Sequence, residues 1–155
     1  MMTFRNQQTG LSTVEFAFVA AVMFTMIFGV IEVARAFFVT SALDEATRRG
    51  ARMAAVCPIN DPAIFQAAAF DNAVLPDLDA GDIAVEYLDT AGAVVASPAT
   101  LAGFRQIRYV RVRVVGFQHQ MFIPFVSALF VMREYATVLP RESLGIPRVG
   151  TIVPC

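Results

Sequence analysis

The sequence predicts an α+β fold in which a long N-terminal helix, part transmembrane and part amphipathic, packs on a small antiparallel β-sheet. Three observations support this prediction. Residues 11–31 are mostly apolar, no proline occurs between Leu11 and Cys57, and alternating apolar and polar residues follow from Ile83 onward. A chain of 155 residues holds one folded domain besides such a helix, but not two independent cores.

The composition agrees with one membrane segment joined to a modest folded domain. Hydrophobic residues make up 57% of the chain and the mean hydropathy is +0.61, both high for a soluble protein. The net charge of −1 gives the molecule no overall field that would attract nucleic acid or acidic lipid.

The first helical segment has the length of a bilayer span. Residues 11–31 form a helix of about 30 Å, which matches the hydrocarbon core. Residues 32–56 continue as a predicted amphipathic half, in which Asp44 with Arg48 and Glu45 with Arg49 are favourable i,i+4 pairs. Its predicted buried stripe consists of Val33, Ala36, Phe37, Leu43, Ala46 and Gly50.

Glu15 lies within the span, where a carboxylate is costly unless it is neutralised or paired. One interpretation is structural, because Ser12 and Glu15 have the spacing of a capping box at a helix start. The other interpretation is functional, and it requires a cation that reaches Glu15 inside the membrane. Capping alone does not explain why Gly10 is followed by a full membrane span, so the functional interpretation is favoured.

A polar leader ending in Gly10, an acid at the fifth position after it and about twenty apolar residues together resemble the class III signal of type IV pilin-like proteins. The chain is most similar to the TadE family of minor pilins, or pseudopilins, of tight-adherence (Flp) pili. The resemblance covers about the first third of the chain. It implies a pilin-like fold, a leader peptide at residues 1–10 and cleavage by a prepilin peptidase between Gly10 and Leu11.

The resemblance also implies a role for Glu15 in assembly. Cleavage would expose the α-amino group of Leu11, which could pair with Glu15 in its own or a neighbouring subunit. The implied partners are the prepilin peptidase, other pilin and minor-pilin subunits, the inner membrane and the pilus assembly platform. The chain could contribute to pilus assembly, tip structure or surface adhesion, and its sequence does not separate initiating, capping and decorating roles.

The implied location is the bacterial inner membrane, with a single span, residues 57–155 in the periplasm, and the pilus or cell surface after assembly. The arginine distribution opposes this orientation. Arg5 precedes the span, whereas Arg35, Arg48 and Arg49 follow it closely, and the positive-inside rule would then place the domain in the cytoplasm. The alternative function is an unprocessed single-pass protein whose domain binds another component of an envelope secretion or assembly complex.

The two cysteines, Cys57 and Cys155, do not have metal-binding spacing. In a periplasmic domain they could form a disulfide that fixes the C-terminus to the end of the long helix. Two unpaired thiols are the alternative.

The C-terminal half supplies the predicted sheet. Asp61 and Pro62 form a helix start, with Asp61 as the N-cap. The elements predicted after it are a helix at 63–74, a strand at 83–88, a turn at 89–92, a short return strand at 93–96, the clearest strand at 107–115 and a final strand at 133–139. Residues 121–132 are apolar but too short to span a bilayer. They are expected to form a buried loop or short helix, or else a contact for a neighbouring subunit or the membrane.

No catalytic or metal-binding constellation occurs in the sequence, so neither an enzyme nor a cofactor is predicted. His119 is the one histidine and is expected in a loop or at a sheet edge. Asp77, Asp79 and Asp82 lack the pattern of a calcium loop and are expected in a solvated turn. The arginines at 108, 111 and 113 could contact nucleic acid, but sparse aromatics and the lack of net positive charge make a solvated sheet face, or salt bridges to an adjacent subunit, the better interpretation.

Overall fold

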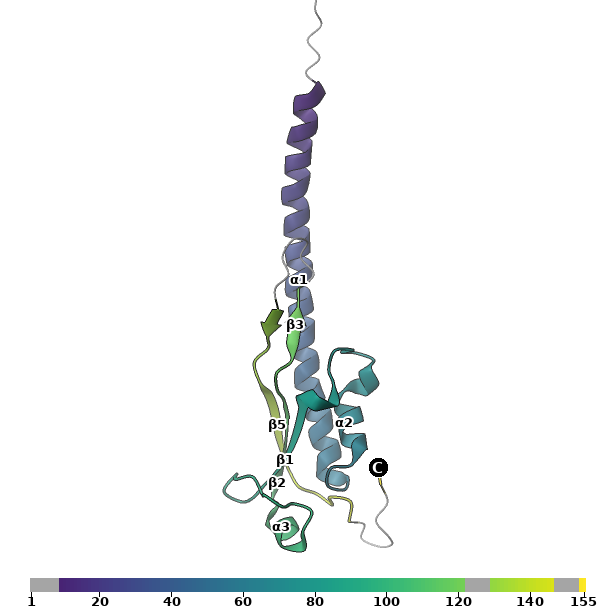
Figure 1. Cartoon of the computed structure of the whole chain (residues 1–155), viewed down its shortest axis with the longest axis vertical. Coiled ribbons are helices and arrows are strands. Elements are labelled where there is room, and N and C mark those ends of the chain that lie inside the picture. The colour runs from purple at the N-terminus through teal and green to yellow at the C-terminus, as the bar shows by residue number, and fades with distance from the viewer. Residues whose placement is uncertain (1–8, 122–128, 147–153) are drawn as a thin grey trace, which may run out of the picture.

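A computed structural model describes residues 9–121, 129–146 and 154–155. Helix α1 (Thr9–Val56) contains 48 residues and is about 72 Å long. Its N-terminal part stands clear of the remaining chain, and its C-terminal part packs on the domain (Figure 1). In the described chain, α1 is the one helix long and apolar enough to cross a membrane, and none of its most apolar window is buried.

The main sheet is antiparallel and has the strand order β1-β2-β5, with β1 at Ile83–Leu88, β2 at Tyr109–Val114 and β5 at Tyr135–Pro140. The central strand pairs Val112 with Val85 on one side and with Thr137 on the other. The predicted α+β fold is therefore confirmed. The final strand begins at Tyr135 rather than at Arg133.

The core lies between the C-terminal half of α1, the sheet and helix α2 (Pro62–Ala68). The valines of β2 are fully buried, and the facing surface of α1 is built from small residues: Ala42, Ala46, Gly50, Ala51 and Ala54. A Cβ atom on Gly50 would lie 3.0 Å from both Ala68 and Val112, so glycine permits the close approach of three elements. The hydroxyls of Thr47 and Thr137 hydrogen-bond at 2.8 Å across the interface between α1 and β5.

The predicted buried stripe of α1 is correct only in its lower part. Leu43, Ala46 and Gly50 are buried, whereas Val33 and Phe37 are exposed. The three-stranded sheet packs on the C-terminal part of the helix, and the turns above it are covered on one side only, by a second, two-stranded sheet at Glu32. Helical spacing alone could not show where the domain ends along the helix axis.

Helix α2 begins as predicted, because the side chain of Asp61 accepts a hydrogen bond from the Ala63 amide at 2.9 Å. It ends at Ala68, earlier than the predicted Val74. A 3₁₀ turn, η1 (Phe70–Asn72), follows, and all three of its residues have positive φ. That left-handed backbone cannot continue an α-helix.

The loop between β1 and β2 differs from the prediction. The turn at Asp89–Gly92 is present, closed by a hydrogen bond from the Gly92 amide to the Asp89 carbonyl. The predicted return strand at 93–96 is wrong, since only a single bridge joins Val94 to Leu88. An unpredicted helix, α3 (Leu101–Gln106), follows, and it is capped by Thr100. It lies at the end of the molecule farthest from the start of α1 (Figure 1).

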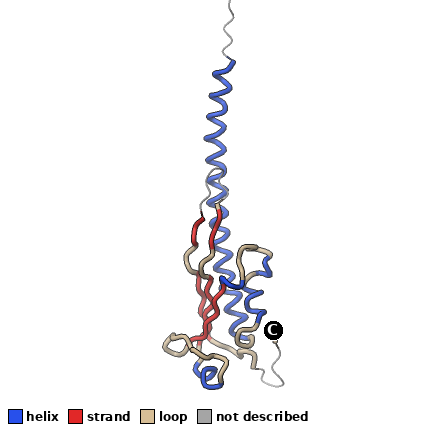
Figure 2. Tube along the Cα trace, viewed as in Figure 1, coloured by secondary structure: helices blue, strands red, loops and turns tan. Residues whose placement is uncertain are grey.

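A second, two-stranded sheet lies beyond the main one, toward the N-terminal end of α1 (Figure 2). It consists of β3 (Gln118–Gln120) and β4 (Leu129–Val131), with His119 opposite Phe130. We call β3 and β4 the hairpin. Residues 122–128 of the predicted apolar loop or short helix lie outside the described residues, while the residues at 129–131 form a strand instead.

The C-terminal segment closes the lower end of α1. The amides of Glu142 and Leu144 donate hydrogen bonds to the Ala55 carbonyl, and the amide of Gly145 donates to the Val56 carbonyl at 2.7 Å. These bonds satisfy carbonyls that a helix end leaves free. Cys57 and Cys155 are joined by a disulfide, with 5.8 Å between their Cα atoms.

Candidate functional site on the long helix

The residues of the expected processing site lie at the start of α1. Because the helix begins at Thr9, the Gly10–Leu11 bond belongs to helical backbone. Ser12 is therefore inside the helix rather than at its N-cap, and the capping box with Glu15 does not form. This corrects the structural interpretation of Glu15.

Glu15 is exposed on the helix surface, and no ion pair or hydrogen bond of its side chain occurs within the described part of the chain. Its neighbours Val14, Phe16 and Phe18 are exposed apolar side chains. A carboxylate surrounded by apolar surface must be protonated or must meet a cation when that surface is covered by lipid or protein. The geometry of Glu15 thus favours a partner supplied from outside the folded domain.

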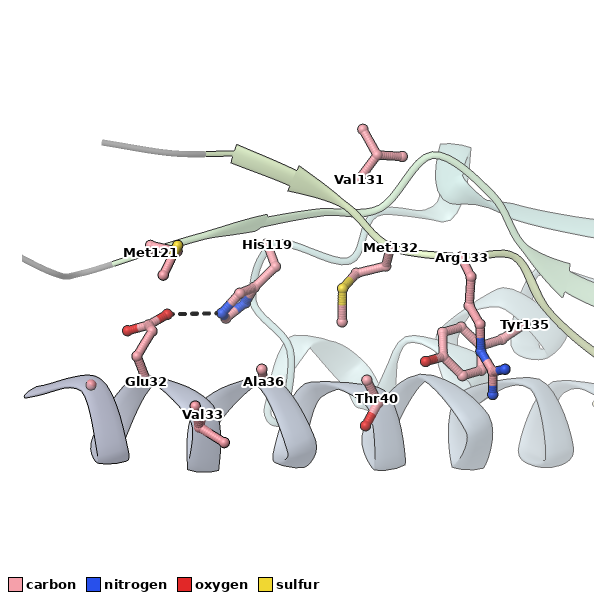
Figure 3. A pocket seen from close by; sticks show the side chains of 11 residues that line it. Glu32, Val33, Ala36, Thr40, His119, Met121, Val131, Met132, Arg133 and Tyr135 are labelled. Carbon is pink, nitrogen blue, oxygen red and sulfur yellow. Dashed lines mark hydrogen bonds and ion pairs between the residues drawn. The ribbon is translucent and has the colours of Figure 1, made fainter. Parts of the chain in front are cut away.

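A second acid, Glu32, lies directly after the predicted span and was missed in the sequence. Its carboxylate accepts hydrogen bonds from Arg35 at 3.0 and 3.1 Å and lies 3.0 Å from Nε2 of His119 (Figure 3). The side chains of Glu32 and His119 are each only 7% exposed. We call Glu32, Arg35 and His119 the juxtamembrane cluster.

The juxtamembrane cluster joins two elements that are distant in sequence. Glu32 and Arg35 come from adjacent turns of α1, whereas His119 is the central residue of β3, 87 residues after Glu32. The Glu32–Arg35 pair has a recognisable i,i+3 spacing. No local signal marks His119 as its partner, because that contact depends on how the hairpin lies against the helix.

The arginines of the sheet are compensated by acids. Arg111 and Arg113 both bind Glu86 on the face of the sheet away from the core, and Arg113 also binds Glu134 at 2.9 Å. Arg108 donates hydrogen bonds to the carbonyls of Arg105 and Ile107. These salt bridges form within the chain, whereas the sequence predicted a solvated face or salt bridges to an adjacent subunit.

These pairs give Glu86 a pH-dependent role in stability. Partial burial raises the pKa of Glu86, but hydrogen bonds and positive charge from Arg111 and Arg113 outweigh it and hold that pKa below its ordinary value. A carboxylate with a lowered pKa contributes stability above its unfolded-state pKa, and the contribution is lost as the pH falls through the folded-state pKa.

We therefore expect Glu86→Gln to lower the free energy of unfolding at pH 7 by roughly 0.5–1 kcal/mol, in the range of partly exposed ion pairs. The difference from the unmodified protein should shrink as the pH falls into the ordinary carboxyl range and vanish below the folded-state pKa of Glu86, and urea titrations at several pH values would measure it. Glu134→Gln is the matched control and should have a smaller effect, because Glu134 is more exposed and binds one arginine. An equal loss at pH 3 and pH 7 would contradict the prediction.

Two of the three acids at 77, 79 and 82 have a local structural role. The amide of Asp79 donates a hydrogen bond to the carboxylate of Asp82 at 3.2 Å, across the 3₁₀ turn η2 (Ala80–Asp82). Among the described residues, no group of three or more acids, histidines or cysteines is placed to hold a metal ion.

Fold and site together define an α+β protein with one helix long enough to span a membrane, an acid near the start of that helix with no partner among the described residues, and a paired charge cluster after the span. Residues 10–52 match the family model for TadE-like protein, which confirms the resemblance over this segment. The matched residues form less than half of the chain. The family is associated with tight-adherence pili as a structural component. Searches of curated proteins and of solved structures found no match.

Proposed function

We propose that this chain is a minor pilin or pseudopilin of a tight-adherence (Flp) pilus, with a structural role in assembly and no catalytic activity. The main support is the position of the family match, which begins at Gly10 and continues along the helix that carries Glu15. The exposed apolar surface around Glu15 also supports the proposal, because it must be covered by lipid or by other subunits.

The proposed location is the inner membrane, with the domain in the periplasm before assembly and on the pilus or cell surface afterwards. The disulfide supports an oxidising compartment. The arginines that oppose this orientation are each paired on the helix: Arg35 with Glu32, Arg48 with Asp44 and Arg49 with Glu45. The positive-inside rule counts basic residues largely regardless of such acids, so the proposed orientation rests on the disulfide and on the family resemblance.

The processing step can be tested at Gly10. We expect the unmodified protein isolated from envelopes to begin at Leu11, and Gly10→Val to retain residues 1–10 and to stay out of pili. Intact-mass measurement would determine both N-termini, and a pilus fraction would measure incorporation. Gly29→Val is the matched control, because the helix has open space around Gly29, and it should be processed normally.

A full-length polypeptide in pili or envelopes of the unmodified strain would contradict the proposal. It would favour the alternative, an unprocessed single-pass protein that binds another component of an envelope complex. The unbroken helical backbone across Gly10 and Leu11 is the observation that favours this alternative, since cleavage there requires the first turn to open.

The assembly role of Glu15 is tested separately. Glu15→Ala should leave cleavage intact but reduce incorporation into pili roughly tenfold to a hundredfold, because it leaves the new α-amino charge unpaired in an apolar setting. Glu45→Ala is the control, since Glu45 is an exposed helical acid with a partner outside the span. Normal incorporation of the Glu15→Ala protein would show that this carboxylate does not guide assembly.

A further inference from the structure

The hairpin overlaps the last turn of the predicted span. Phe117, just before β3, borders the same hollow as Val39, and the next contact is between His119 and Glu32. Met121 then lines a groove together with Gly29, which lies within the span. From Phe117 to Met121 the chain therefore advances along α1 toward its N-terminus and reaches the depth of the apolar span.

The charges of the juxtamembrane cluster are paired within the chain, while the exposed acid Asp77 borders the same hollow as Phe38 and His119. Glu32 and His119 are buried against each other, and Arg35 also binds Glu32. The sequence from Gln120 to Met132 contains no charged or titratable residue. A surface whose charges are internally paired can enter the headgroup region without leaving an ion unpaired.

Exposed apolar side chains continue past Ile31 at the same level. Val33 is 57% exposed, Phe37 69% and Phe38 58%, and Val131 on β4 is 69% exposed. Val131 borders the groove between α1 and the hairpin, and Figure 3 shows its side chain directed away from α1. Residues 11–38 form about 42 Å of helix, which corresponds to a whole bilayer with its headgroup layers rather than to the hydrocarbon core alone.

We infer that the bilayer covers this surface, and that the hairpin and the α1 turns up to Phe38 lie in its interfacial layer. We call this surface, made of Val33, Phe37, Phe38 and Val131, the interfacial collar. This inference rests on the membrane anchoring in the proposed function, but not on peptidase cleavage or on pilus assembly.

Lipid fits the interfacial collar better than a second copy of the chain. Phe37 and Phe38 are consecutive in a helix and so point about 100° apart, whereas a packed partner helix covers one narrow stripe. The interfacial collar is also continuous with the exposed apolar surface of the span, which lipid must cover. Between α1 and the hairpin lies a groove of about 750 Å³ whose lining is mostly apolar, including Gly29, Ala36 and Met132, and also contains Glu32, His119 and Arg133 (Figure 3). Its apolar part offers space to acyl chains.

The absence of tryptophan from the sequence allows a direct test. Single-tryptophan proteins, Val131→Trp and Phe37→Trp, would be reconstituted as full-length chains in phosphatidylcholine vesicles with brominated acyl chains, which quench nearby tryptophan. Phe24→Trp, inside the span, is the positive control. Leu101→Trp, 71% exposed on the distant helix α3, is the negative control. All four positions are exposed, so the fold should tolerate the changes, and circular dichroism would verify it.

We expect the bromolipids to quench the tryptophan fluorescence of the Val131→Trp and Phe37→Trp proteins. The quenched fraction should lie between the value for Phe24→Trp and the near-zero value for Leu101→Trp. Val131→Trp fluorescence as insensitive as that of Leu101→Trp would overturn the inference while leaving the span intact. A Val131→Trp emission that is blue-shifted, is not quenched by bromolipid and depends on protein density in the vesicles would assign the surface to a second copy of the chain. That result would also overturn the inference. Lack of quenching in Phe24→Trp would remove the membrane anchoring itself.

Discussion

Replacing both cysteines with serine is expected to lower the free energy of unfolding of the domain by about 4–5 kcal/mol. The disulfide closes a loop of 98 residues, and a crosslink of that length strongly restricts the unfolded chain. Cys57 is also fully buried directly after α1, so a serine hydroxyl there would lose water without gaining an assured partner. Urea unfolding of the full-length chain in detergent micelles, followed by circular dichroism, would measure the loss.

The disulfide also fixes the position of the C-terminus. The disulfide and the hydrogen bond from the Cys155 amide to Asp61 hold the C-terminus beside the end of α1. Reduction of the unmodified protein should therefore reproduce the instability of the double-serine variant, and each single-serine variant should match it. Stability unchanged by reductant, in protein isolated from cells without an oxidation step, would show that the thiols are free and would remove the support for a periplasmic domain.

The predictable part of the fold depends on strong periodic patterns and capping residues. The alternating valines of β2 indicated the central strand, and Asp61 with Pro62 marked the start of α2. The paired acids and arginines on α1 were correctly predicted for the same reason, since their partners are four residues away. In each case the determining interaction is local in sequence.

The missed features depend on tertiary contacts. Helix α3 packs so closely on its own loop that a Cβ atom on Gly103 would lie 2.0 Å from the Ser97 carbonyl oxygen. A single glycine in a segment of six residues gives no sign of such packing. The exposure of Phe37 and the burial of Glu32 likewise follow from where the sheet ends and the hairpin begins along α1. Apolar spacing predicts a helical face but not the length of the domain that covers it.

The juxtamembrane cluster gives the second large expected effect. His119→Ala should destabilise the docking of the hairpin on α1 by about 2–4 kcal/mol, because it leaves the buried Glu32 carboxylate with Arg35 as its remaining described partner. Limited proteolysis of the full-length chain in micelles would detect the effect as faster cleavage within residues 118–131. Gln118→Ala is the matched control, since its side chain is exposed on the same strand and should leave the cleavage rate unchanged.

A double replacement tests whether the hairpin needs the polar Glu32–His119 pair or only a packed contact at these two positions. Glu32→Leu combined with His119→Leu removes both polar groups, and an apolar pair of similar size is often neutral or stabilising where removal of one partner of a buried polar pair is not. Arg35 is partly exposed, so it can turn toward solvent when Glu32 is lost. The double variant should therefore recover most of the protease resistance that His119→Ala loses. If it is as sensitive as His119→Ala, the hairpin needs this specific hydrogen-bonded pair; if neither variant is more sensitive than Gln118→Ala, the pair does not hold the hairpin to the helix.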